Sequence, residues 1–105
     1  MHVIVAGIDA EEIGNAIEAQ DHDVSVVDVA NRPSLESAGI HDAAALVLTE
    51  AAQATAIAVA KELNPDLKTV VYTGDSLPDF ARGQVDLVVD PDLLDAETVA
   101  EELDS

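Results

Sequence analysis

Five short runs of β-branched and apolar residues alternate with helix-forming segments along the chain, and this alternation restricts the fold more than any other feature. The runs are residues 3–6, 24–29, 44–49, 69–73 and 85–89. They are almost continuously apolar, as expected of parallel strands covered by helices on both faces. We therefore predict an α/β fold: a doubly wound three-layer sandwich whose five-stranded parallel sheet has the order 2-1-3-4-5, a truncated Rossmann-like arrangement.

Four segments between and after these runs have helical patterns. We predict helices over residues 10–20, 34–38, 52–63 and 95–103, and a loop or weak helix over residues 75–83. The helix at 52–63 is stopped by Asn64-Pro65, because a proline cannot continue a helix and restricts the residue before it. No linker or change in composition interrupts the pattern, so residues 1–105 are expected to form a single domain.

The charge of the chain is unusual for a folded domain. Twenty-two acidic residues against four basic ones give a net charge of −18, yet 49% of the residues are hydrophobic. Such a surface repels itself in dilute salt, and the repulsion largely disappears at about 1 M salt, where the screening length is about 3 Å. We interpret the chain as an acidic, halophilic protein; the alternative is an acidic decoy or a binder of cationic partners. Nucleic-acid binding is not expected, because it requires a basic surface.

The sequence also limits the cellular setting and the chemistry. No apolar stretch is long enough to span a membrane, and no signal-peptide pattern follows the first residue, so a cytoplasmic protein that is not inserted in a membrane is expected. Cysteine is absent, and the three histidines are spread out, so no metal site is predicted. No catalytic nucleophile or acid–base pair stands out. We therefore expect no enzymatic activity.

The turn after the first strand carries a glycine followed by carboxylates. Gly7 is followed by Asp9 and Glu12, which have the spacing of a capping box, in which each side chain bonds a backbone N–H at the start of a helix. The same position binds phosphates in many α/β proteins, because helix N-termini favour anions. Carboxylates there would repel a phosphate. Further acids follow the other strands, and we interpret them as turn residues, with a cation site as the alternative.

Three segments resemble a known family. They are L-E-S-A-G-I-H-D-A at 35–43, A-V-A-K-E-L-N-P-D-L-K at 58–68 and G-Q-V-D-L-V-V-D-P at 83–91. In this order they resemble the TrkA-N domain, also called the N-terminal RCK domain, a Rossmann-type module that regulates potassium channels and transporters. The resemblance implies NAD or an adenine nucleotide as ligand, unless the site has lost its ligand. It also implies regulation in trans, by docking on a transporter or by self-association.

The resemblance implies specific nucleotide-binding residues. Counted back from Asp28, the G-x-G-x-x-G turn of that family falls on residues 5–10, where Gly7 is the retained middle glycine and Ala10 takes the third position. By this resemblance Gly7 would admit the phosphate, and Asp28 would bond the ribose hydroxyls. That family has six strands in the order 3-2-1-4-5-6. Its third strand has no counterpart here, which leaves the five-strand order predicted above.

Two more residues, and two departures, complete this expected site. Asn31 and Thr49 would line the crevice of the nucleotide. Val5 stands in place of the first glycine, and Asp9 lies beside the expected pyrophosphate path. Both departures weaken nucleotide binding. The main prediction is therefore a small non-catalytic regulatory or ligand-sensing domain, and the alternative is an interaction or dimerisation module with a decayed nucleotide site.

A degenerate response-regulator receiver is a further alternative, because receivers share the 2-1-3-4-5 order. Their phosphoryl chemistry needs acids after the first strand, an acceptor Asp after the third, a Thr or Ser after the fourth and a Lys after the fifth. Asp9 would supply one acid and Thr73 the hydroxyl. The acceptor position falls in Leu48-Thr49-Glu50, which has no Asp, and the lysine position carries Asp90. An active receiver is therefore not expected. The two edge strands are candidate pairing surfaces.

Overall fold

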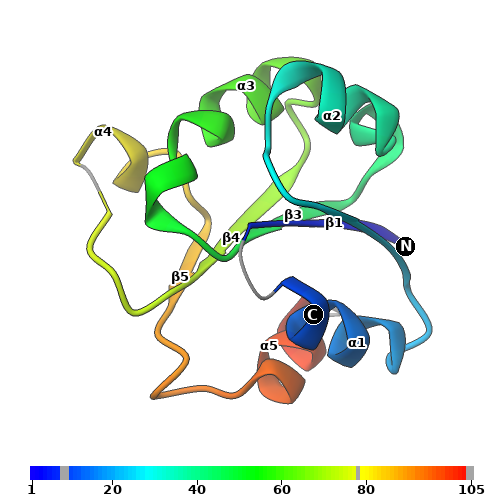
Figure 1. Cartoon of the computed structure of the whole chain (residues 1–105), viewed down its shortest axis with the longest axis vertical. Helices are drawn as coiled ribbons and strands as arrows, with labels where there is room; N and C mark the ends of the chain where they lie inside the picture. The colour runs from blue at the N-terminus through cyan, green and yellow to red at the C-terminus, as the bar shows by residue number, and fades with distance from the viewer. Residues whose placement is uncertain (8–9, 78, 104–105) are drawn as a thin grey trace.

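The computed structural model describes residues 1–7, 10–77 and 79–103. One parallel sheet forms its centre, in the order β2-β1-β3-β4-β5 (Figure 1). The strands are β1 (His2–Ala6), β2 (Asp23–Val27), β3 (Ala45–Leu48), β4 (Lys68–Tyr72) and β5 (Leu87–Val89). The predicted fold class and strand order are therefore confirmed.

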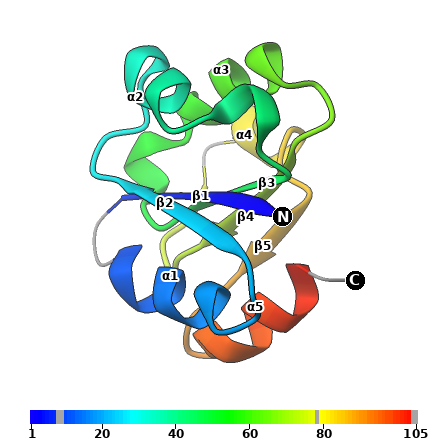
Figure 2. The same ribbon diagram turned by 90° about the vertical axis from the view of Figure 1, so that its right-hand side faces the viewer.

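The helices cover both faces of this sheet. They are α1 (Ala10–Glu18), α2 (Arg32–Ser37), α3 (Thr55–Leu63), α4 (Asp79–Arg82) and α5 (Ala96–Leu103), with short 3₁₀ turns at Ile40–Asp42 and Ala51–Gln53. Helices α1 and α5 lie on one face, and α2, α3 and α4 lie on the other (Figures 1 and 2). Such a three-layer arrangement satisfies strands that are apolar on both sides.

The alternation of side chains along β1 explains the two cores. Ile4 and Ala6 join the cluster under α2 and α3, whereas Val3 and Val5 join the cluster under α1 and α5. All four side chains are fully buried. Because successive residues of a strand point to opposite faces, one continuous apolar run supplies both cores. This is why the run at the N-terminus becomes an inner strand.

Several element boundaries differ from the predicted ones. The run at 24–29 ends as strand at Val27, and the run at 85–89 begins as strand only at Leu87. Before it, the Asp86 side chain accepts a hydrogen bond from the backbone N–H of Thr69 at 2.8 Å, and the Asp86 backbone N–H donates to the Thr69 carbonyl oxygen at 3.0 Å. The helix predicted from residue 52 begins at Thr55, after a 3₁₀ turn. These differences leave the sheet order unchanged.

Candidate functional site

The carboxyl ends of the strands form the edge at which open α/β sheets bind ligands. A cavity of about 370 Å³ lies there, between α1, the ends of β3 and β4, and the start of α5. Its polar lining includes Glu12, Thr49, Tyr72, Thr73 and Asp95. No lysine, arginine or histidine lines it among the described residues. The cavity therefore offers hydroxyl groups and carboxylates, and its charge disfavours anions.

The electrostatics of this cavity centre on Tyr72. Burial, followed by the negative charges of Glu12 and Asp95, raises the pKa of the Tyr72 hydroxyl above its ordinary value. That hydroxyl donates a hydrogen bond to the carbonyl oxygen of Leu94 at 3.4 Å. The Asp95 carboxylate accepts from the hydroxyl and the backbone N–H of Thr98 at the start of α5, and these bonds lower its pKa. Asp95 is therefore the N-cap of α5.

Gly7 meets Thr49 where the loops after β1 and β3 lie side by side. Its φ is +120°, and a Cβ atom added to it would overlap the Thr49 hydroxyl oxygen and lie 3.3 Å from the backbone nitrogen of Glu50. The Thr49 hydroxyl in turn donates to the carbonyl oxygen of Ala6 at 3.2 Å. The absence of a side chain at Gly7 therefore has a structural reason, which is close packing between two neighbouring loops.

Gln53 connects the end of β2 to the loop after β3. Its side-chain oxygen accepts from the backbone N–H of Ala30 at 2.7 Å, and its side-chain nitrogen donates to the Asp28 carbonyl oxygen and to the Glu50 carboxylate, both at 3.0 Å. Asp28 itself is exposed beyond β2. The side-chain oxygen of Asn31 accepts from the backbone N–H of Ser34 at 3.0 Å, so Asn31 caps α2.

The residues predicted for a nucleotide site are thus only partly brought together. Gly7 and Thr49 are in contact, and Thr49 lines the cavity. Asp28 follows Val27, whose carbonyl oxygen accepts from the Gly7 N–H at 3.1 Å. Ala10 is the first residue of α1. Asp9 lies outside the described residues, and with it the predicted capping box.

Sequence reasoning missed Gln53 and the cavity roles of Tyr72 and Asp95. The D-x-x-T spacing from Asp95 to Thr98 is a recognisable capping signal. Nothing local indicates that Gln53 bonds Ala30 and Asp28, which follow another strand. The described residues contain no group of three or more histidine, aspartate or glutamate side chains placed to hold a metal ion. Among the described helices, none is long and apolar enough to cross a bilayer.

The sequence profile of one protein family matches residues 3–103. The chain belongs to DUF7126, a family of unknown function. No curated protein matches the sequence of this DUF7126 chain significantly.

Solved structures similar to the DUF7126 chain include receiver-type folds. An orphan response regulator from H. pylori has a TM-score of 0.76 at 12% identity, over 99% of this chain and 93% of that one. A putative pilus assembly protein from Burkholderia thailandensis has a TM-score of 0.71 at 19% identity, over 99% and 95%. A CheY-like receiver domain from Methanospirillum hungatei has a TM-score of 0.67 at 17% identity, over 98% and 93%. At these identities the likeness shows the fold alone.

The resemblance of the DUF7126 chain to TrkA-N domains was therefore wrong, and so was the role in potassium transport regulation inferred from it. The family match is to DUF7126, and the similar folds are receivers and a pilus assembly protein. The misleading segments consist of turn and helix-stop signals, such as Asn64-Pro65, which recur wherever a helix returns to a parallel strand. Gly7, the retained glycine of the supposed motif, packs against Thr49.

The strand ends of the DUF7126 domain can be compared with the chemistry that a receiver needs. Thr49 directly follows β3, Thr73 follows β4 and Asp90 follows β5. Thr73 is buried, and its backbone N–H donates to the carbonyl oxygen of Val89 at 3.0 Å, so the ends of β4 and β5 adjoin. Thr49, Thr73 and Asp90 therefore all stand at the carboxyl edge of the sheet.

Proposed function

We propose that this chain is a receiver-like domain that acts by binding another protein chain and does not transfer phosphoryl groups. The observation that carries the proposal is the pair of substitutions at the carboxyl edge of the sheet. Thr49 follows β3 and Asp90 follows β5, where phosphoryl transfer requires a carboxylate nucleophile and a lysine. The proposal includes no catalytic activity.

The chemistry of these two positions supports the proposal. The Thr49 hydroxyl donates to the Ala6 carbonyl oxygen at 3.2 Å, so its proton is directed into the sheet. No described histidine or lysine lines the cavity to activate it. A phosphoryl group near Thr73 would meet the negative charge of Asp90, and repulsion between like charges destabilises both the bound group and its transition state.

The carboxyl edge offers equally little support for a nucleotide. Gln53 ties the chain after β2 to the loop after β3, across the strand ends where the ribose of a dinucleotide would lie. Gly7 packs against Thr49. Glu12 and Asp95 make the adjacent cavity acidic. We therefore propose a domain that works without a nucleotide cofactor.

Exposed apolar side chains on and around α4 and β5, called the apolar face below, support the binding role. Phe80 on α4, Val88 on β5 and Leu93 after β5 are 57%, 52% and 80% exposed. Val88 and Leu93 line a hollow of about 540 Å³ beside α4, together with Leu77 and Arg82. Phe80 is one of only two aromatic residues in the chain. Exposed apolar patches of this kind on folded domains mark interaction surfaces.

A phosphorylation assay tests the first half of the proposal. The chain is incubated with acetyl phosphate and Mg²⁺ in molar KCl, beside an active receiver as positive control, and intact masses are compared. We expect no phosphoryl adduct on the wild-type chain. The Thr49→Asp/Asp90→Lys variant restores the two missing groups and serves as the matched gain-of-function variant. A stoichiometric, hydroxylamine-sensitive adduct on the wild-type chain would overturn the proposal.

Site-specific photo-crosslinking tests the binding half. A photoreactive residue is placed at Phe80 on the apolar face, and at Glu101 on the exposed side of α5 as control, in the cell from which the chain comes. We expect a defined adduct from Phe80 only, and its loss when Val88→Asp is added. Equal labelling from both positions, or labelling insensitive to Val88→Asp, would contradict a role for this face.

A further inference from the structure

Strand β2 is an edge strand of the sheet, paired only with β1 within the described residues (Figure 2). The backbone N–H of Asp23 donates to the Met1 carbonyl oxygen at 3.0 Å, and the Val27 carbonyl oxygen accepts from the Gly7 N–H at 3.1 Å. In a parallel pair, alternate residues bond the same neighbour. The backbone groups of Val24 and Val26 therefore point away from the sheet.

This edge lacks the usual protection against pairing. Exposed edges are normally protected by short strands, prolines, lysines or bulges. Strand β5, at the opposite edge, has three residues and is followed closely by Pro91. Strand β2 has five residues, D-V-S-V-V, without proline or lysine, and pairs residue for residue with β1 without a bulge. Val26 is 44% exposed. Of the two edges, β2 is the one suited to accept another strand.

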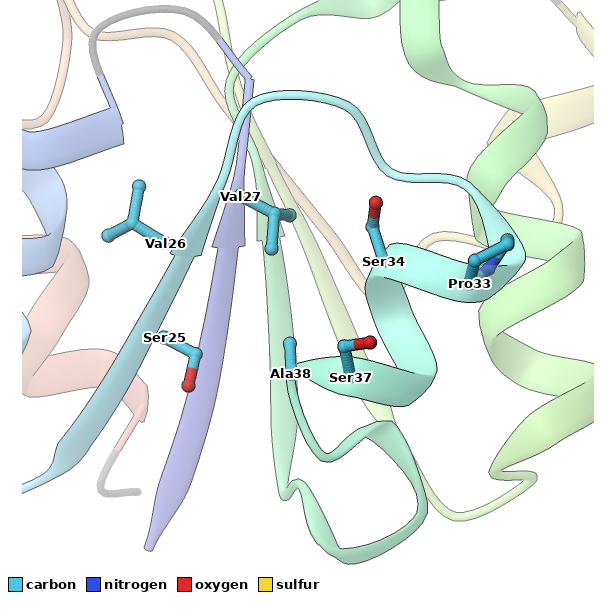
Figure 3. Close-up of a pocket in the computed structure, with 7 residues that line it drawn as sticks. All are labelled: Ser25, Val26, Val27, Pro33, Ser34, Ser37 and Ala38. Carbon is cyan, nitrogen blue, oxygen red and sulfur yellow. The ribbon is translucent and has the colours of Figure 1, made fainter.

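A groove runs beside this edge on one face of the sheet. Its volume is about 540 Å³, and it lies between β2 and α2 (Figure 3). Its lining includes Ser25, Val26 and Val27 of β2 and Ser34 and Ser37 of α2. The Val26 side chain points away from α2 (Figure 3). A strand added to β2 would therefore have room for its side chains on the α2 side.

We infer that a second copy of this chain pairs with β2 through its own β2, antiparallel and centred on Ser25. In this register Val24 of each copy lies opposite Val26 of the other copy. The two residues of each such pair exchange both backbone N–H···O bonds, so their outward-pointing backbone groups are all hydrogen-bonded. Asp23 lies opposite Val27, and Asp28 lies opposite His22. Between residues 22 and 28 of the two paired strands, no carboxylate lies directly opposite another carboxylate, although the chain carries a charge of −18.

The net charge makes the pairing dependent on salt. Two copies of −18 repel each other in dilute buffer, and the screening length falls from about 10 Å at 0.1 M to about 3 Å at 1 M salt. The dimer should therefore form at molar KCl and dissociate as salt is removed. A cationic peptide on the same edge would bind more weakly as salt is added. This inference goes beyond the proposed function, because it depends only on the edge of β2.

Single-cysteine variants test the register directly, since the chain has no cysteine. In the inferred dimer the two Ser25 Cα atoms form a non-hydrogen-bonded pair about 4.5 Å apart, within the disulfide range of about 4.4–6.8 Å. We expect Ser25→Cys to give disulfide-linked dimers under mild oxidation in molar KCl. Val88→Cys, on the other edge strand, is the matched control and should remain a monomer. The inference is overturned if the two variants crosslink equally, or if Ser25→Cys does not crosslink at all.

Sedimentation of the wild-type chain and a proline variant provides the second measurement. The Val26 N–H points outward, so Val26→Pro should abolish the dimer while keeping the unfolding midpoint that the wild type has at protein concentrations where it is a monomer. Val26→Lys, a charged edge residue, should have the same effect. A wild-type chain that stays monomeric at every KCl concentration refutes the inference, as does a dimer that survives both variants. Neither result would affect the phosphorylation assay, so the two proposals can fail separately.

Discussion

Gly7→Ala tests whether the glycine after β1 is required by packing or by a bound phosphate. The residue has a φ of +120°, and a Cβ atom there would overlap the Thr49 hydroxyl oxygen and lie 3.3 Å from the Glu50 nitrogen. A packing role predicts destabilisation in the absence of any ligand. A purely phosphate-binding role predicts normal stability without ligand, because the added methyl group would obstruct only the ligand.

The expected magnitude follows from two terms. Holding a residue other than glycine at this φ costs about 1–3 kcal/mol. Forcing a methyl group into a filled space costs about 1–3 kcal/mol more. Gly7→Ala should therefore lower the free energy of unfolding by about 2–6 kcal/mol, a large share of the 5–15 kcal/mol or so that is typical of a domain. Thr49→Ala alone should cost only about 1 kcal/mol, through the loss of its hydrogen bond to Ala6.

A double-mutant cycle in urea, at a fixed molar KCl concentration, separates the two terms. Gly7→Ala/Thr49→Ala should recover about 1–3 kcal/mol relative to the additive value, because the overlap term disappears while the φ term remains. Gly7→Ala/Thr49→Val is the matched control, since valine places a methyl group where the hydroxyl was, and should recover nothing. A cost below about 0.5 kcal/mol for Gly7→Ala, or equal rescue by both partners, would refute the reasoning.

Three further predictions concern stability. The midpoint of thermal unfolding should rise steadily as KCl increases from about 0.1 to 1 M, through screening of the negative surface, and an equal concentration of sucrose should not reproduce the full rise. The pKa of the Asp86 carboxyl is lowered, first by the hydrogen bond from the Thr69 backbone N–H and then by the bond and charge of Lys61. The ionised Asp86 carboxylate therefore stabilises the fold above the ordinary pKa range of a carboxyl, and this stabilisation is lost as the pH falls through the lowered pKa of the folded state. Asp86→Asn should cost about 1–2 kcal/mol of unfolding free energy at neutral pH and should flatten the dependence of stability on pH below about pH 4. The Asn64 side chain donates to two backbone carbonyl oxygens before β3, at 2.9 and 2.8 Å, so Asn64→Ala should cost about 1–3 kcal/mol in urea unfolding, and no loss would exclude a role for these bonds.

The candidate site could be predicted from the sequence only at the level of strand ends. Thr49 is the last residue of the predicted run 44–49 and was placed at the carboxyl edge, where it lines the cavity. Asn31 was placed in the same crevice, but it caps α2. An Asn or Asp side chain before a helix readily accepts from the unpaired backbone N–H three residues later. Gln53 and Tyr72 gave no sequence signal, because the backbone groups of Ala30 and Leu94 that they bond lie more than twenty residues away along the chain.

The sequence by itself determined the parallel α/β architecture and the strand order. These properties follow from hydrophobic periodicity and from the length of each apolar run, both of which can be read along the chain. Tertiary structure alone decided that Gly7 contacts Thr49, that the cavity is acidic and that the β2 edge is open beside a groove. Those features depend on strand register, which brings together residues about forty positions apart. Short turn signals carry no information on strand register, and this is why they could not identify the family of this chain.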